Sequence, residues 1–175
     1  MIKSLLLGIS LSLGFSQAAL PETFNKENNQ KISLPTCYDS HGKKVSYRAA
    51  DTWEMRKEHV GVAMAFQDAS GMPIIKYDTD VLLKTPYQFT QHALSHECAH
   101  HKLGHLYIPY QLSETEKASL EKKADCNAVK VNNFTARDVE IIGDAFKALY
   151  PSDPNAMIKW EVPDKKSILM QCLKF

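Results

Sequence analysis

One stretch of the chain, Ala93 to His105, constrains the fold more than any other because it contains a His-Glu-x-x-His motif. Side chains four residues apart lie on the same face of an α-helix, so His96 and His100 can present two imidazoles to a single metal ion. Glu97 then lies beside that ion, where its carboxylate can accept a proton from a water molecule. The motif predicts a helix with two metal ligands and a general base; the alternative is an exposed histidine-rich helix.

The length and composition of the chain fit one compact domain. Its 175 residues are 44% hydrophobic, which is enough to form a buried core. The 21 basic and 20 acidic residues nearly cancel, and no run of like charge occurs. The charge pattern therefore indicates neither nucleic acid nor a charged membrane surface as a partner, and it makes no prediction about the oligomeric state.

The first eighteen residues have the pattern of a secretory signal peptide. Lys3 gives a positive start, an apolar run from 5 to 15 follows, and Ala18 closes a small-residue cleavage site. We expect cleavage after Ala18 and export to a periplasm or out of the cell. A retained anchor is the alternative, but the apolar run is too short to span a bilayer, so no stable membrane insertion is expected. Residues 19–31 are polar and Asn-rich, which predicts a flexible arm before a single domain over 32–175.

The chain contains four cysteines, an even number that favours disulfides in an oxidising compartment. Of the three possible pairings we predict Cys98 with Cys126 and Cys37 with Cys172. The first bond would join the two helices that carry the predicted metal ligands, and the second would join the ends of the chain. Cys98 and Cys126 could instead be zinc thiolates, but Cys98 lies two residues from each histidine of the motif and so points away from their face.

A β-hairpin is predicted just before the motif. Val60 to Phe66 alternates large and small apolar residues, Asp68 to Gly71 has turn composition, and Met72 to Tyr77 can form the second strand. Such a hairpin can be simple scaffold, or its edge can bind an extended peptide by adding a strand. Upstream, residues 44–47 are predicted to be extended, and a helix over 48–58 is expected to place Trp53 and Met55 in the core.

Helix boundaries are predicted from capping residues. Thr85 as cap, with Pro86 as the first helical residue, begins the motif helix, and Gly104 suits its end after about Leu103. Two further helices are predicted from a capping box over Ser113–Glu116 to Asn132–Asn133, and from a Thr135 cap to about Leu149. Residues 158–175 give no clear pattern.

A third ligand is needed, because a catalytic zinc site combines three protein ligands with one open position. The candidates are His105, Glu121 and Asp125. Glu121 stands 21 residues beyond His100 on the next predicted helix, and Asp125 follows it by four, so the two carboxylates share one face. We therefore expect Glu121 to bind the metal and Asp125 to accept the free ring N–H of a ligating histidine. His92 lies on the same stripe as His96 and is expected to pack or support the ligands.

Taken together, His96-Glu97-Cys98-Ala99-His100 and Glu121-Lys122-Lys123-Ala124-Asp125 resemble the two motifs of the gluzincin metallopeptidases, specifically the HtpX- and Oma-like family. The similarity covers roughly Met72 to Val129. It implies one zinc ion bound by His96, His100 and Glu121, with Glu97 as general base and His105 as a neighbour of the site. The late His-Pro and Arg of many members have no counterpart, since Val162-Pro163 precedes only Lys165 and Lys166. Tyr107, Tyr110 and His101 are the candidates to stabilise the reacting carbonyl.

These features together predict a small, mostly helical α+β domain of the zincin type, with a hairpin beside the metal-binding helix. The expected function is a zinc-dependent endopeptidase in which Glu97 activates a metal-bound water to hydrolyse peptide bonds of a peptide or unfolded protein. One alternative is a non-catalytic zinc-dependent binding or chaperone module that acts on exported proteins. Another is a metal that only holds a small domain together.

Overall fold

The computed structural model describes residues 24–25, 30–57, 61–108, 111–150 and 165–174, and over them the protein is a mixed α+β domain with more helix than strand. This confirms the predicted fold class. The predicted signal peptide lies outside the described residues, as does most of the predicted arm. Within that arm, β1 (Phe24–Asn25) pairs antiparallel with β2 (Gln30–Lys31).

The sheet contains the predicted hairpin. Strands β4 (Ala63–Gln67) and β5 (Pro73–Asp78) pair antiparallel, and β5 lies between β4 and a third strand, β3 (Ser46–Ala50). The turn between them forms because the Asp68 carboxylate accepts the backbone N–H groups of Ser70 and Met72. One long edge of β4 is therefore left unpaired within the described sheet.

Strand β3 differs from the predicted helix over 48–58. It pairs in parallel with β5 over all five of its residues, and helix α1 begins only at Thr52 and ends at Lys57. Pairing with β5 therefore overrides the local preference of residues 48–50. Met55 is buried at 1% exposure as predicted, but the prediction for Trp53 is wrong, since its side chain is 70% exposed. A six-residue helix on the surface buries only one face.

The longer helices begin and end near the predicted residues. Helix α3 (Tyr87–Lys102) follows the short α2 (Thr79–Leu82), and Gly104 adopts a left-handed φ of 72° where α3 gives way to the 3-10 helix η1 (His105–Tyr107). The N-cap is Pro86 rather than the predicted Thr85, whose hydroxyl donates instead to the carbonyl of Leu82.

Three more helices complete the described chain. Helices α4 (Glu114–Val131) and α5 (Ala136–Leu149) each begin with a capping box, one at Ser113 as predicted and one at Thr135. Helix α6 (Lys165–Cys172) lies within residues 158–175, for which no element is predicted. Among the helices of the described residues, none combines the length and apolar character needed to cross a membrane.

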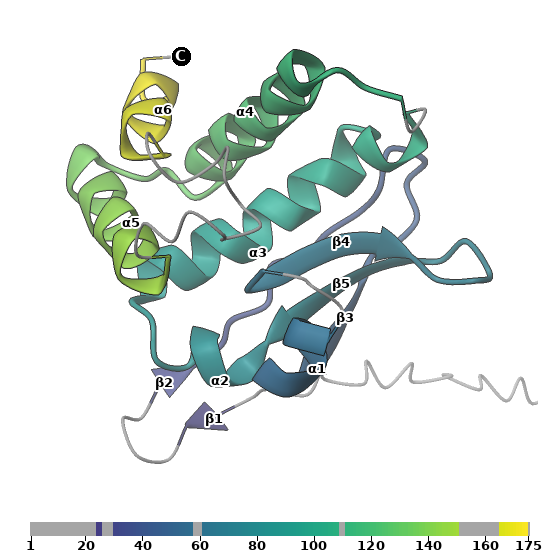
Figure 1. Ribbon diagram of the computed structural model, residues 1–175, viewed down its shortest axis with the longest axis horizontal. Helices are drawn as coiled ribbons and strands as arrows, with labels where there is room; N and C mark the ends of the chain where they lie inside the picture. Colours follow the sequence, from purple (N-terminus) through teal and green to yellow (C-terminus); the bar gives the residue numbers. More distant parts are fainter. Residues whose placement is uncertain (1–23, 26–29, 58–60, 109–110, 151–164, 175) are drawn as a thin grey trace, which may run out of the picture.

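Helix α3 runs through the middle of the molecule, with the sheet on one side and α4, α5 and α6 on the other (Figure 1). This position explains its composition, since Phe89 and Leu94 are fully buried and several of its polar side chains, such as Thr90, His92 and His101, are buried too. The core continues on both sides of α3, with Ile75 from the sheet on one side and Ile142 from α5 on the other. The predicted metal-binding motif therefore lies on the helix with the most buried residues among the described helices.

The predicted disulfide pairing is wrong. The bonds join Cys37 to Cys98 and Cys126 to Cys172, with Cα–Cα separations of 5.8 and 4.8 Å. Helix α4 packs on the face of α3 that carries the motif histidines, and Cys98 points away from that face, so it cannot reach Cys126. It meets the N-terminal segment instead, while Cys126 faces α6.

Candidate metal centre

The two predicted histidine ligands and the predicted carboxylate converge on one point between α3 and α4. His96 Nε2 lies 3.0 Å from one oxygen of Glu121 and 3.1 Å from His100 Nε2, and His100 Nε2 lies 3.4 Å from the other Glu121 oxygen. These three residues form a group whose ligand atoms all lie within 4.8 Å of one another. Helical spacing places the histidines one turn apart, and the packing of α4 on α3 brings the carboxylate to them.

The separations fit a metal ion. Ligands bound to zinc at 2.0–2.1 Å in a tetrahedral arrangement lie about 3.3 Å apart. The distances among His96, His100 and Glu121 are 3.0, 3.1 and 3.4 Å. Two imidazoles and one carboxylate, with a fourth position open to solvent, are also the ligand set of catalytic zinc sites. Both the geometry and the chemistry of the three residues therefore suit one zinc ion.

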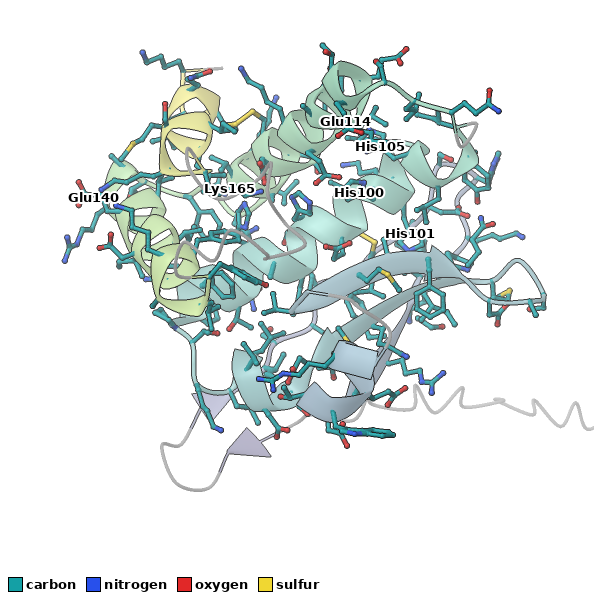
Figure 2. All side chains as sticks on the ribbon, viewed as in Figure 1. His100, His101, His105, Glu114, Glu140 and Lys165 are labelled. Carbon is teal, nitrogen blue, oxygen red and sulfur yellow. A yellow bond between two sulfur atoms is a disulfide. The ribbon has the colours of Figure 1, made fainter. Side chains whose placement is uncertain are left out.

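Both imidazoles are oriented by hydrogen bonds at their Nδ1 atoms, on the other side of the ring from the Nε2 atoms that converge. His96 Nδ1 lies 2.8 Å from an oxygen of Asp125, to which it donates, so that its Nε2 keeps a lone pair for a metal. His100 Nδ1 lies 3.1 Å from His105 Nδ1, and donation from His100 to His105 leaves the Nε2 of His100 free in the same way. In Figure 2, His100 and His105 lie on the side of α3 that faces α4. Both ligands thus have the supporting partner that metal-binding histidines need.

The electrostatics of the centre favour a positive charge. Burial lowers the pKa of His96, but Asp125 and Glu121 outweigh that effect and raise it to about 10. Burial raises the pKa of the Glu121 carboxyl, and His100 and His96 more than offset this, so the net pKa is lowered. Lone pairs that converge at about 3 Å repel unless a cation or a proton lies between them. Without a metal, the centre binds a proton in its place.

Glu97 lies on the sheet side of the centre. Its carboxylate accepts a hydrogen bond of 2.7 Å from the backbone N–H of Ala65 in β4. The Ala65 N–H lies on the edge of β4 that does not pair with β5. The hydrogen bond therefore connects the predicted general base to the unpaired edge of the sheet. Glu97 is also the immediate neighbour of His96 in the sequence of α3.

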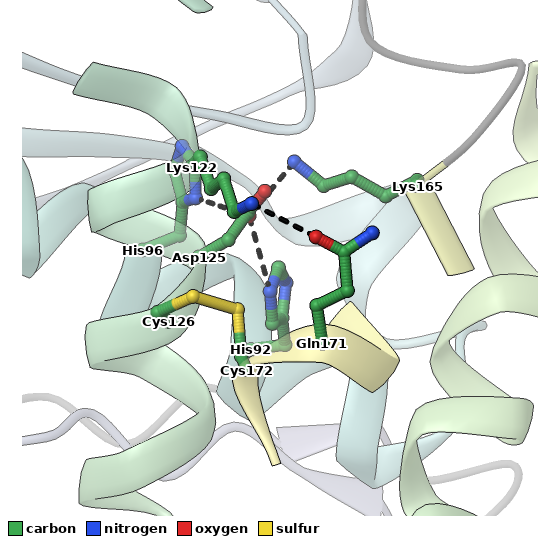
Figure 3. The surroundings of a disulfide bond; sticks show 8 residues. All are labelled: His92, His96, Lys122, Asp125, Cys126, Lys165, Gln171 and Cys172. Atoms are coloured by element: carbon green, nitrogen blue, oxygen red, sulfur yellow. Dashed lines mark hydrogen bonds and ion pairs between the residues drawn. A yellow bond between two sulfur atoms is a disulfide. The ribbon is translucent and has the colours of Figure 1, made fainter. Parts of the chain in front are cut away.

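A second group of possible ligands lies deeper, where His92 joins His96 and Asp125 (Figure 3). His92 Nε2 is 3.4 Å from an Asp125 oxygen, and burial lowers the pKa of His92 to about 4. The same oxygen lies 2.8 Å from the ammonium nitrogen of Lys165. Because that ammonium already supplies the positive charge of this inner group, we assign the metal to the outer one.

Two of the three residues considered for carbonyl stabilisation have other hydrogen-bond partners. His101 is fully buried, lies on the sheet side of α3 in Figure 2, and its Nε2 is hydrogen-bonded to the carbonyl of Ile74. The hydroxyl of Tyr107 donates to the Asp39 carboxylate. Tyr110 lies outside the described residues. His101 thus links α3 to β5, and the Tyr107 hydroxyl is already engaged by Asp39.

Two contacts of the centre were not expected from the sequence. Lys165 reaches Asp125 from a segment 40 residues further along the chain, and no local pattern marks it. The hydrogen bond from Ala65 to Glu97 is made by a backbone N–H group, and amino-acid composition does not show where such a group lies. His105, expected only as a neighbour, contacts the ring of His100 directly.

A scan against protein-family models and searches of curated proteins and of solved structures found no match for this chain. Its likeness to the gluzincin metallopeptidases accordingly rests on the two motifs, residues 96–100 and 121–125.

Proposed function

We propose that the protein is a zinc-dependent endopeptidase that hydrolyses peptide bonds. The observation that carries the proposal is the convergence of His96, His100 and Glu121 on one point, with Glu97 next to them on α3. Two imidazoles and a carboxylate leave a coordination position for solvent or substrate, which a purely structural zinc site does not need. A carboxylate near that position would have a clear role in hydrolysis as the group that moves protons.

The reaction adds water across the peptide bond. A bound zinc ion would supply Lewis acidity to the water and to the substrate carbonyl. The Glu97 carboxylate takes one proton from the water as the water oxygen forms a bond to the carbonyl carbon. Glu97 then passes that proton to the amide nitrogen as the carbon–nitrogen bond breaks, which releases a carboxylic acid and an amine. Asp125 and His105 hold the ligand rings in place throughout.

The unpaired edge of β4 is the proposed binding place for the substrate backbone. An extended peptide can add to such an edge through main-chain hydrogen bonds, with little dependence on sequence. The edge runs alongside α3 in Figure 1, and the Ala65 amide on it is within hydrogen-bonding distance of Glu97. A peptide bound there would pass the general base, which supports an unfolded or flexible protein as the substrate.

Export is part of the proposal. Two disulfides in the described chain are compatible with an oxidising location, where such bonds persist. The pattern of residues 1–18 supports a signal peptide that leads there. The substrates would then be peptides or unfolded proteins in a periplasm or outside the cell.

The test is the Glu97→Gln variant with zinc analysis and a cleavage assay on casein. Gln keeps an acceptor for the Ala65 amide but cannot take up a proton, so we expect one zinc per chain and a loss of cleavage of about 100-fold or more. Glu140→Gln on the surface of α5 is the matched control and should cleave normally. Normal cleavage by zinc-loaded Glu97→Gln would refute the proposal. A zinc-bound wild type that suppresses aggregation but cuts nothing would favour the binding-module alternative.

A further inference from the structure

The Asp125 carboxylate lies at the centre of a buried network behind the metal ligands. One of its oxygens lies 2.8 Å from His96 Nδ1, 2.8 Å from Lys165 Nζ and 3.4 Å from His92 Nε2. Asp125 is 1% exposed, and Lys165 is 4% exposed. Figure 3 shows the lysine approaching the carboxylate from α6, on the opposite side from His96. The contact therefore joins α6 to the residue that orients a metal ligand.

A buried carboxylate needs a compensating positive charge as well as hydrogen bonds. His92 lies in an environment that disfavours its charged form, and His96 is neutral when its Nε2 binds a metal. Of the described partners of Asp125, Lys165 is then the one that carries a full positive charge. Its ammonium therefore keeps the carboxylate in this buried position.

Helix α6 is attached to α4 at both of its ends. Lys165, the first residue of α6, contacts Asp125 of α4. Cys172, the last residue of α6, is bonded to Cys126, which follows Asp125 in α4. The ring of Phe146 in α5 lies 5.2 Å below the ammonium and adds a cation–π contact. The lysine is thus placed by packing, a disulfide and an aromatic ring, as expected for a group whose position matters.

We propose that Lys165 is a positioning residue for the metal centre, and this inference rests on the proposed zinc site. Lys165 holds Asp125 so that its oxygen accepts the Nδ1–H of His96, which presents Nε2 to the metal. It does not touch the substrate or the metal. Through this chain of contacts, a lysine outside both motifs sets how tightly the centre binds zinc.

The experiment measures the zinc affinity of the folded protein by competition with a chromogenic chelator. Replacing an outer partner of a ligand weakens metal binding by about 10- to 100-fold, and we expect a loss in this range for Lys165→Met. Lys165→Arg keeps the charge and should recover most of the affinity. Lys122→Met is the matched control, because Lys122 also links α4 to α6, through Gln171, but at the surface, and it should bind zinc like the wild type.

Circular dichroism and thermal unfolding show which variants are folded. If Lys165→Met does not fold, Lys165→Gln gives the same comparison, since its amide can still donate to Asp125 but carries no charge. A folded, uncharged variant that binds zinc as tightly as the wild type, or more tightly, would overturn the inference. Equal losses in Lys165→Met and Lys122→Met would do so too, because they would reflect only the packing of α6.

A cleavage assay distinguishes this inference from the proposed function. If the protein is a peptidase, saturating zinc should restore the kcat of Lys165→Met, because the lysine acts on zinc binding and not on the reaction. A kcat that stays low in the fully loaded variant would contradict a positioning role. If the wild type binds zinc but cuts no peptide, the proposed function fails, and the affinity comparison still tests Lys165.

Discussion

Removing the two disulfides one at a time should separate fold stability from the metal centre. The first perturbation is Cys126→Ala with Cys172→Ala, and the second is Cys37→Ala with Cys98→Ala. The bonds close loops with sequence separations of 46 and 61 residues. Loop-closure entropy assigns each bond a stabilisation of about 4 kcal/mol, and the two values differ by only about 0.3 kcal/mol. Chain entropy alone therefore predicts nearly equal losses of stability.

Zinc binding should respond differently to the two changes. The Cys126–Cys172 bond holds the end of α6, whose first residue Lys165 contacts Asp125. The Cys37–Cys98 bond instead anchors α3 to the segment around Cys37 and does not involve α6. Only loss of the first bond should weaken zinc binding, by about tenfold.

The assay is urea unfolding of the metal-free proteins, followed by zinc titration of the folded ones against a chelator. The expected result is two similar free energies of unfolding and two different zinc affinities. Stability losses that differ by more than about 2 kcal/mol would refute the entropic estimate. Equal zinc affinities in the two double variants would refute the link from α6 to the metal centre.

Two further predictions concern the ligand rings. His105→Ala removes the partner 3.1 Å from Nδ1 of His100, and zinc affinity measured by chelator competition should fall about tenfold; an unchanged value would show that the contact does not orient the ring. The pKa of His96 is raised to about 10 in the metal-free protein, so below that pH zinc must displace a proton. Zinc affinity should then rise by about tenfold per pH unit from pH 7 to 9, and a flat profile would contradict this reasoning.

Elements that begin or end at residues with local hydrogen bonds or a special backbone conformation were predicted well from the sequence. The capping box at Ser113 and the cap at Thr135 begin α4 and α5 as expected, because each closes its hydrogen bonds within four residues. The positive φ of Gly104 ends α3 for an equally local reason. The hairpin was also predicted, since its strands are neighbours in the chain and the Asp68 turn fixes their register.

Elements that depend on distant partners were predicted poorly. Residues 48–50 were expected to be helical but form a strand, because β5 offers them a complete parallel ladder. Trp53 was expected in the core because it is large and apolar, yet α1 turns it towards solvent. In both cases the outcome depends on which surface the segment packs against, and local composition does not carry that information.

The sequence by itself determined the arrangement of ligands along each helix. Four-residue spacing places His96 with His100 and Glu121 with Asp125, because helical geometry is the same wherever the helix lies. The tertiary structure decided which faces meet. The packing of α4 on α3 brings Glu121 to the histidines, turns Cys98 towards Cys37, and lets α6 deliver Lys165 to Asp125. These contacts join residues 21 to 61 positions apart, where the lowest free energy of the whole packed chain, and no local rule, selects the partner.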